Sequence, residues 1–229
     1  MKSAQLQVQM FGTFALESGS NKVSEEDNRS KKMWLLLAYM IYRRDKVITT
    51  QEYIDLLWGD EDRSSNPQNA LKTMFHRVRS ALDTLWPAAG HQLILRQGST
   101  YIWNPEIPLQ LDVDEFDRLC QEGATAADDD EKLKLYQEAL AIYQGDFLAR
   151  LSSHLWAIPI AAHYHQAYLQ LVMSVLPMLE ERRQFSEMAA LCRDAVVHEP
   201  YSEELYCSLM KSLIQLGDQQ DDGGADAAL

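Results

Sequence analysis

The segment between residues 66 and 86 places polar and cationic side chains at a spacing suited to reading duplex DNA. On a helix with about 100° per residue, the side chains that point directly away from the apolar face are Asn69, Thr73, His76 and Ser80. The side chains at the edges of this polar face are cationic: Lys72, Arg77 and Arg79. Asparagine can pair with adenine through two hydrogen bonds, threonine offers a methyl group to thymine, and arginine or lysine reaches guanine or phosphate. This pattern predicts a recognition helix that lies in the major groove.

The sequence also predicts the helices that hold this segment in place. The recognition helix has Asn66 as its N-cap and Pro67 in its first turn, where the missing N–H costs nothing. Its buried side is expected to consist of Leu71, Met74, Phe75, Val78, Ala81, Leu82 and Leu85. A shorter helix is expected to begin at a capping box, in which Thr49 and Glu52 each satisfy a backbone N–H of the other, and to end at Gly59.

Strand patterns on both sides of these helices complete a winged helix-turn-helix unit. Apolar and polar residues alternate in residues 5–24, which predicts a small antiparallel sheet, and residues 30–43 are expected to form the first helix. After the recognition helix, a hairpin is expected over residues 93–103, with its turn at Gly98. Arg96 lies beside that turn, from where its side chain could reach a phosphate or the adjacent minor groove.

The second half of the chain is predicted to be helical throughout. Its last three helices are expected over residues 159–182, 186–198 and 202–216. Their apolar positions repeat at 34 residues, so that Leu171, Val172, Leu176 and Leu179 map onto Leu205, Tyr206, Met210 and Leu213. That period is the spacing of tetratricopeptide repeats, in which helix pairs bury their faces by stacking on neighbours. The repeat breaks off after Gly217, so the last apolar face needs a cover from a second subunit, a C-terminal continuation, or packing that the sequence does not show.

Charge divides the chain into two parts of different character. Residues 1–112 contain 13 lysines and arginines and 13 acidic residues, whereas residues 113–229 contain 8 and 21. The whole net charge of −13 therefore comes from the second half. Within the first half, residues 63–96 carry five cations against Asp83 alone, a local charge of +4. Such a distribution indicates two modules that face different partners.

The sequence does not indicate an enzyme, a metal protein or a membrane protein. No nucleophile elbow, phosphate-binding loop or dinucleotide motif occurs, so we expect no catalytic residue and no cofactor. His154, His163 and His165 lack the spacing of zinc ligands. The acidic run 128–131 fits a helix N-terminus better than a calcium loop, so no metal is expected. The longest apolar run, residues 33–42, is too short for a membrane span, and without a secretion signal we expect a cytoplasmic protein with no membrane partner.

Three segments together resemble the Streptomyces antibiotic regulatory protein (SARP) family, in which an OmpR-type winged helix precedes a bacterial transcriptional activator domain. They are residues 48–60 (ITTQEYIDLLWGD), 69–82 (NALKTMFHRVRSAL) and 111–116 (LDVDEF). Trp156 and the 34-residue repeat also fit the second domain, and the resemblance covers residues 5–217. The basic residue that the family commonly carries after the position of Arg79 is Ser80 here, which weakens the attraction to phosphate.

The patterns and the resemblance together imply a mainly α (α+β) protein with two domains. We expect an N-terminal winged helix-turn-helix domain over residues 1–110, a tetratricopeptide-like all-α domain over 111–217, and an acidic, glycine-containing tail over 218–229. The resemblance implies a transcriptional activator that binds double-stranded DNA as a homodimer on direct repeats and contacts RNA polymerase and its sigma factor. The predicted DNA-binding residues are Asn69, Lys72, Thr73, His76, Arg77, Arg79, Ser80 and Arg96.

Two alternatives to this interpretation stay open. Polar residues on the outer face of a helix are usually only solvated, and Arg77 or Arg79 could pair with Asp83 or with the acidic second domain. The chain could also be a non-enzymatic protein-interaction module, with helical repeats that bind a protein or peptide and a winged helix for docking or dimerisation. A mobility-shift experiment separates these hypotheses, because an interaction module gives no salt-sensitive shift with DNA.

Overall fold

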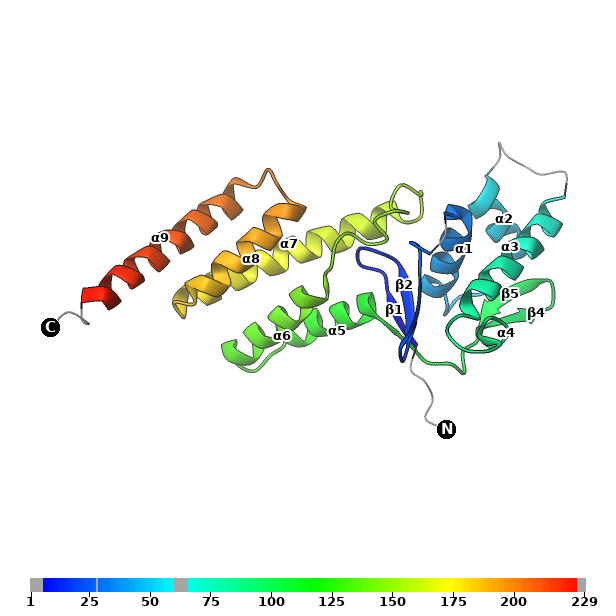
Figure 1. The fold of residues 1–229 in the computed structure, drawn as a ribbon, viewed down its shortest axis with the longest axis horizontal. Helices are drawn as coiled ribbons and strands as arrows, with labels where there is room; N and C mark the ends of the chain where they lie inside the picture. The colour runs from blue at the N-terminus through cyan, green and yellow to red at the C-terminus, as the bar shows by residue number, and fades with distance from the viewer. Residues whose placement is uncertain (1–5, 28, 60–65, 226–229) are drawn as a thin grey trace. The chain divides into compact units, whose positions relative to one another are not determined.

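In the computed structural model the chain forms two compact units (Figure 1). The first unit lies within Met1–Glu115 and Asp146–Ile158, and the second within Phe116–Gly145 and Pro159–Leu229. The residues that the structure describes are 6–27, 29–59 and 66–225. The predicted fold class is confirmed, since a small N-terminal sheet and a winged-helix set of helices precede a part that is entirely helical.

Alternating side chains build the larger sheet of the first unit. β1 (Leu6–Gln9), β2 (Ala15–Ser18) and β3 (Asn21–Ser24) pair antiparallel in sequence order, as the alternation predicts. β6 (Leu109–Leu111) adds a parallel partner on the other side of β1. The sequence does not predict β6, because three residues are too few to show a period of two.

α1 (Lys31–Tyr42) is the central helix of the first unit. All of its side chains from Met33 to Ile41 are buried, which is typical of a helix that has partners on every side. The Trp34 ring lies edge-on to Phe14 beside the sheet, with the ring centroids 6.2 Å apart. α1 also contacts the two helices that follow it, so it joins the sheet to the rest of the unit.

The helices and the hairpin that follow α1 form the second part of this unit. They are α2 (Thr50–Trp58), α3 (Pro67–Leu82), α4 (Ala89–Leu93), β4 (Ile94–Gln97) and β5 (Thr100–Trp103). α2 begins at the predicted cap, where Thr49 Oγ1 accepts a hydrogen bond from the backbone N–H of Glu52 at 3.1 Å. The Glu52 carboxylate accepts a hydrogen bond from the Tyr39 hydroxyl of α1, a tertiary contact that the local capping pattern does not predict.

Asp112 joins the end of β1 to the start of α5 (Asp112–Ala124). One of its carboxylate oxygens accepts hydrogen bonds from the backbone N–H groups of Met10 at 2.7 Å and Phe11 at 2.8 Å. The other oxygen accepts from the N–H of Val113 at 2.8 Å. The side chain therefore satisfies donors that a strand end and a helix start leave unpaired. Burial raises the pKa of Asp112 to about 6, against the effect of these hydrogen bonds.

We expect Asp112 to make the chain less stable as the pH rises from about 4 to about 7. Its pKa is about 6 in the folded state against an ordinary 3.8, so the folded state binds more protons in this interval and ionisation disfavours folding. The free energy of unfolding, measured by chemical denaturation, should fall by roughly 2 kcal/mol. Asp112→Asn should reduce the dependence of the unfolding free energy on pH. A smaller dependence of the same sign should remain, because burial also raises the pKa of Glu25. A variant with the full slope of the parent chain would contradict the assignment.

The segment Asp146–Ile158 follows the sixth helix in sequence yet belongs to the first unit. Phe147 forms an isolated antiparallel bridge with Phe11, just after β1. The Trp156 ring lies edge-on to Tyr39 of α1, with the ring centroids 5.1 Å apart. The resemblance assigns Trp156 to the second domain, whereas the ring packs among aromatic partners of the first unit.

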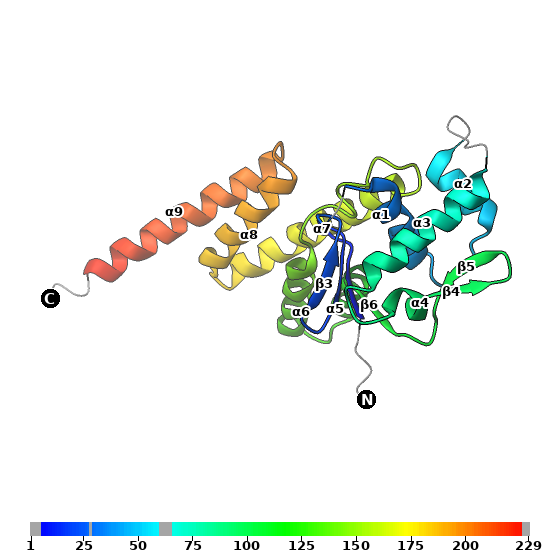
Figure 2. The same ribbon diagram turned by 45° about the vertical axis from the view of Figure 1, so that its right-hand side comes forward.

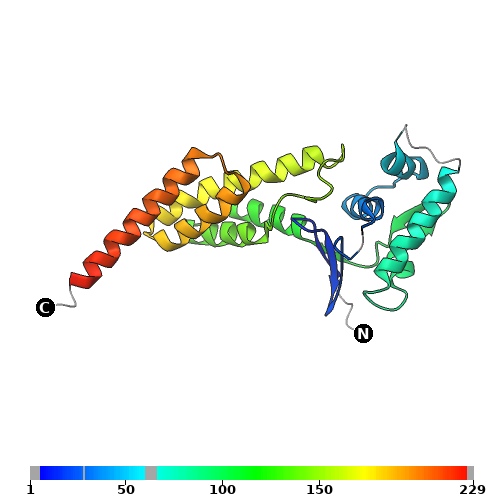
Figure 3. The ribbon, with the colours of Figure 1, turned by 45° about the horizontal axis from the view of Figure 1, so that its top comes forward.

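Helices alone form the second unit. Together with α5 they are α6 (Asp129–Ile142), α7 (Ile158–Glu181), α8 (Phe185–His198) and α9 (Glu203–Ala225). The Asp128 side chain caps α6 by accepting from the N–H groups two and three residues further on, as the acidic run predicts. Tyr143, at the end of α6, stacks on Tyr168 of α7 at 4.2 Å, and both rings meet His198 of α8 at 5.3 Å. Figures 2 and 3 show α7, α8 and α9 as successive neighbours in this unit.

The predicted end of the last helix at residue 216 is wrong, because α9 continues to Ala225. Glycine ends a helix when its backbone enters the left-handed conformation and makes the C-cap hydrogen bonds. The described glycines with positive φ are Gly12, Gly19, Gly59, Gly98 and Gly145. Gly217 is not among them, so the helix passes through it at an expected cost of about 1 kcal/mol relative to alanine.

Candidate nucleic-acid interface

α3 carries most of the predicted DNA-binding residues on its exposed face. The helix begins where the sequence predicts, since the Asn66 side chain accepts a hydrogen bond from the N–H of Asn69 at 3.1 Å. Six of the predicted side chains are exposed: Asn69, Lys72, Thr73, His76, Arg77 and Ser80. The buried residues of the helix are Leu71, Met74, Phe75, Val78 and Leu82. The predicted division of α3 into a polar and an apolar face is therefore confirmed, whereas the contacts of these residues with DNA stay a prediction.

Aromatic rings fix the buried side of α3 to its neighbours. The Phe75 ring stacks on Tyr101 of β5, with the centroids 3.8 Å apart, and lies edge-on to Tyr53 of α2 at 5.2 Å. The Tyr53 hydroxyl donates a hydrogen bond to the Tyr101 carbonyl oxygen at 3.1 Å, and burial raises the pKa of Tyr53. Three elements thus share one aromatic cluster, and this cluster holds the exposed face of α3 in a fixed orientation relative to α2 and the hairpin.

The predicted hairpin is confirmed, and its tip is tied to the start of α2. Gly98 turns the chain with a φ of +61°, a conformation that residues with a side chain rarely adopt. Thr100 Oγ1 donates to the Ile48 carbonyl oxygen at 2.6 Å, and Thr50 Oγ1 donates to a carbonyl oxygen in the turn at 2.8 Å. Arg96 is exposed on β4, and its Nε donates to the Gly98 carbonyl oxygen at 3.2 Å. The hydrogen bonds to Ile48 and Thr50 therefore hold the hairpin, and with it Arg96, in place.

Arg79 is the predicted residue whose environment differs from that of the others. Its side chain is half-buried, and its Nη2 donates to the Ile94 carbonyl oxygen of β4 at 2.7 Å. The guanidinium also lies over the Tyr101 ring, 5.4 Å from the centroid, while its Nε is buried without a hydrogen-bond partner. The guanidinium thus holds β4 against α3, and its Nη2 is already engaged within the protein.

Asp83, the acidic residue close to these cations, has a different partner from the one considered in the sequence. Its Oδ1 accepts a hydrogen bond from the backbone N–H of Gly90 at 2.9 Å. Gly90 belongs to α4, a short helix that the sequence does not predict, and a Cβ at Gly90 would lie 2.2 Å from the Arg79 carbonyl oxygen. α4 therefore packs backbone to backbone against the C-terminal part of α3, an approach that only glycine permits.

A cavity of about 210 Å³ opens between α2, α3 and the hairpin. The residues that line it are Thr50, Gln68, Leu71, Lys72, Arg96, Ser99 and Tyr101. Lys72 and Arg96, predicted separately as phosphate contacts, border the same hollow from different elements, and two such cations suit the phosphate backbone of a duplex. Sequence reasoning missed Thr50, Gln68 and Ser99, because their proximity depends on how the hairpin folds against α2.

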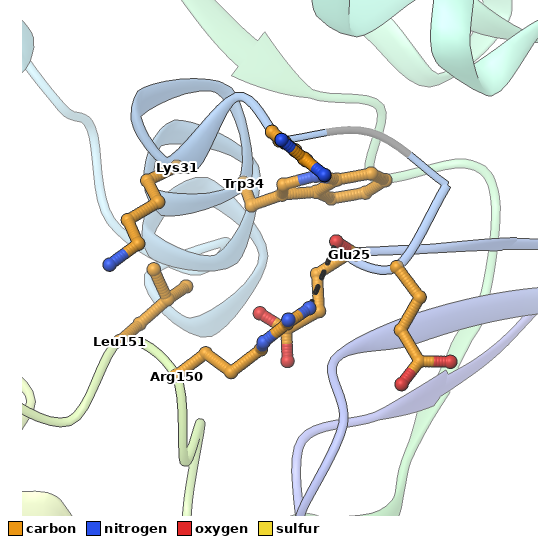
Figure 4. Close-up of a pocket in the computed structure, with 7 residues that line it drawn as sticks. Glu25, Lys31, Trp34, Arg150 and Leu151 are labelled. Carbon is orange, nitrogen blue, oxygen red and sulfur yellow. Dashed lines mark hydrogen bonds between the residues drawn. The ribbon is translucent and has the colours of Figure 1, made fainter.

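None of the predicted DNA-binding residues lines the larger cavity of the first unit, which has a volume of about 430 Å³ (Figure 4). Its lining residues are Glu25, Glu26, Arg29, Lys31, Trp34, Arg150 and Leu151. Figure 4 shows Arg150 beside Glu25, and its Nη1 donates to the Glu25 carbonyl oxygen at 3.4 Å. The Glu25 side chain accepts from the N–H of Phe14 at 3.1 Å, and burial raises its pKa. These contacts tie the end of β3 to the segment that follows α6.

The histidines of the second half do not gather into a common site. His165 Nε2 lies 3.3 Å from a carboxylate oxygen of Glu199, and the His163 ring packs against Tyr164. In the part of the chain that the structure describes, no group of three or more histidine, cysteine or acidic side chains has a geometry that could hold a metal ion. No helix within these described residues is long and apolar enough to cross a membrane.

Comparisons with known proteins point to a family for the second half and to a fold for the whole. Residues 111–222 match the family model of the bacterial transcriptional activator domain. The solved structure of Mycobacterium tuberculosis EmbR in complex with a low-affinity phosphopeptide is similar, with a TM-score of 0.68 and 17% sequence identity. The match covers 96% of this chain and 57% of that one, so this chain corresponds to little more than half of it. No curated protein matched the sequence.

Proposed function

We propose that this chain, in which residues 111–222 match the family model of the bacterial transcriptional activator domain, is a transcriptional regulator of the SARP type and a cytoplasmic, sequence-specific DNA-binding protein. The observation that carries the proposal is the exposed face of α3, where polar side chains lie between cations while the opposite face is clamped by aromatic rings. A polar ridge held rigidly in this way suits the major groove, into which a helix fits.

The residues of this surface divide by the chemistry that each can offer to a duplex. Asn69 and Thr73, in the N-terminal half of α3, suit contacts with adenine and with the methyl group of thymine. Lys72 and Arg77 flank them, and Arg96 extends the cationic surface onto the hairpin, so these three suit phosphate contacts. His76 and Ser80 continue the polar ridge as further donors and acceptors. Arg79 acts in this scheme by holding β4 in place.

The helical second unit supplies the protein contacts of the proposed regulator. It contains most of the residues that match the activator family, and residues 113–229 carry the entire net charge of −13. Negative charge of this size repels the phosphate backbone, which leaves the second unit free to bind proteins while α3 binds DNA. We therefore propose an activator that recruits RNA polymerase through its helical unit and binds DNA as a homodimer.

Binding to DNA should depend on salt in proportion to the phosphates contacted. With a duplex selected from a random pool, log K is expected to fall with log salt concentration at a slope of about −0.9 per contact, or about −3 if Lys72, Arg77 and Arg96 each neutralise one phosphate. Arg77→Ala should make the slope less steep by about one, whereas Asn69→Ala should lower sequence discrimination at an unchanged slope. Fluorescence anisotropy over a series of salt concentrations measures both quantities.

The matched control for this experiment is an exposed cation outside the proposed surface. Lys134 of α6 is exposed, and Lys134→Ala should leave both the affinity and the slope unchanged. Failure to select any duplex, or binding that does not change with salt, would overturn the proposal and favour a protein-interaction module.

A further inference from the structure

The larger cavity of the first unit is lined by charges of both signs that do not pair with one another (Figure 4). Two are the carboxylates of Glu25 and Glu26, which follow β3, and three are the cations Arg29, Lys31 and Arg150. None of these five side chains forms an ion pair within the part of the chain that the structure describes. Because the two signs do not neutralise each other, both are available to a ligand.

Glu25 is the charged residue of this cavity that is most deeply buried. It is 5% exposed, and its Oε1 accepts the hydrogen bond from the Phe14 N–H at 3.1 Å. The Arg150 guanidinium donates to the carbonyl oxygen of Glu25, and no described residue donates to Oε2 of the carboxylate. A buried carboxylate normally has donors for its oxygens, since an unpaired buried charge is costly. The position of Oε2 therefore suits an amino group of a ligand.

Arg29 and Lys31 bring positive charge to the cavity from the start of α1. Both side chains are exposed. Figure 4 shows the Lys31 amino group well apart from the Glu25 carboxylate. Arginine and lysine bind a carboxylate through charge-assisted hydrogen bonds. The cavity thus offers a place for a carboxylate that is separate from the place for an amino group.

The rest of the cavity wall is apolar. It consists of Trp34 and Leu151, whose exposed fractions are 2 and 1%. The volume of about 430 Å³ falls within the range of roughly 300–1,000 Å³ that small-molecule sites have. One amino group and one carboxylate fill only a part of that space, so the ligand also needs an apolar portion. A molecule that combines these three groups is an amino acid.

We propose that this cavity binds a free amino acid with a large apolar side chain. The amino group meets Glu25, and the carboxylate meets Arg29 and Lys31. The apolar side chain packs against Trp34 and Leu151. Such a ligand links the segment Asp146–Ile158 to the start of α1, and both belong to the first unit. The inference goes beyond the proposed function and is independent of DNA binding.

Calorimetric titration of the full chain with L-leucine, L-phenylalanine and L-tryptophan tests the proposal. At least one of the three is expected to bind with a Kd of about 0.1 mM or below. Glycine should bind at least about tenfold more weakly, because it has no side chain to bury. The N-acetyl derivative and the C-terminal amide of the amino acid that binds should each lose about tenfold or more in affinity, since each lacks one of the two charges.

Matched variants of the chain locate the binding site. Arg29→Ala should weaken binding of the amino acid about tenfold. Glu25→Gln keeps an acceptor for the Phe14 N–H, and it should weaken binding of the free amino acid about tenfold while leaving that of the N-acetyl derivative unchanged. Lys46→Ala is the control, since Lys46 is exposed in the first unit and does not line the cavity. Circular dichroism verifies the fold, and the exposed Arg29 keeps the test valid if Glu25→Gln does not fold.

Three results would overturn the amino-acid site. They are absence of binding by all three apolar amino acids, equal affinity for the free amino acid and its N-acetyl derivative, and unchanged affinity in Arg29→Ala. DNA binding measured on the same preparations separates a failure of this inference from a failure of the proposed function, because a chain that binds DNA but no amino acid contradicts only the former.

Discussion

Gly90→Ala should destabilise the first unit by about 3 kcal/mol or more and lower its melting temperature by about 10 °C. A Cβ at this position would lie 2.2 Å from the carbonyl oxygen and 2.4 Å from the Cα of Arg79, both backbone atoms of α3. Neither atom can move without distorting α3, so the methyl group must push α4 away. The displacement also breaks the hydrogen bond from the Gly90 N–H to Asp83. Thermal and chemical denaturation measure the loss.

Gly217→Ala is the control for the added methyl group. Nothing lies within 4 Å of a Cβ at Gly217, which has an ordinary helical environment in α9. Alanine is the better helix former there, so the variant should be more stable by about 0.5–1 kcal/mol. Parent-like stability of Gly90→Ala would show that α4 does not pack closely on α3.

Arg79→Ala should weaken DNA binding about tenfold or more without changing its salt dependence. The substitution removes the hydrogen bond to the Ile94 carbonyl oxygen and the packing of the guanidinium on Tyr101. Leaving that carbonyl without its donor costs about 2 kcal/mol, which loosens the packing of β4 on α3 and with it the orientation of the exposed face of α3. Because no phosphate contact of Arg79 itself is lost in this scheme, log K should fall while its slope against log salt stays close to that of the parent chain.

Arg77→Ala is the variant with which Arg79→Ala is compared. Arg77 is exposed on the same helix, and its loss should make the slope less steep by about one while leaving the stability of the chain unchanged. Denaturation curves and salt titrations of the two variants therefore separate positioning from phosphate contact. An equal change of slope in Arg79→Ala would mean that its guanidinium leaves β4 and reaches DNA in the complex.

Local patterns predicted the elements of the candidate site well, because caps, helical periods and turn glycines act over a few residues. Asn66 and Thr49 cap their helices through the hydrogen bonds that the sequence predicts, and Gly98 turns the hairpin. The two faces of α3 likewise follow from a period of 3.6 residues. A helical period assigns each side chain to one face of the helix, and the hydrogen bonds that form the helix join residues only four positions apart.

Contacts that join distant segments were missed. The period placed Arg79 at the edge of the polar face, but its half-buried position depends on the carbonyl of Ile94, which the hairpin brings back to α3. α4 depends on the close approach of Gly90 to α3, and nothing in the neighbouring sequence signals that approach. Trp156 belongs with Tyr39 of α1 although more than a hundred residues separate them, and no short-range pattern reports such a pair.

The larger sheet is completed only when β6 and Asp112 join β1, so a nascent chain cannot complete it until residue 112 has been synthesised. The backbone N–H groups of Met10 and Phe11 donate to Asp112, which lies 102 and 101 positions further along the chain. The parallel neighbour of β1 is β6, which immediately precedes Asp112 in the sequence. The contacts among α1, α2 and α3 span far fewer residues and should form first as the polypeptide leaves the ribosome. Until residue 112 has emerged, β1 keeps an open edge, and an open edge is the part of a sheet that pairs with foreign strands. Until then, the β1 edge is a site at which this polypeptide can pair with a foreign strand.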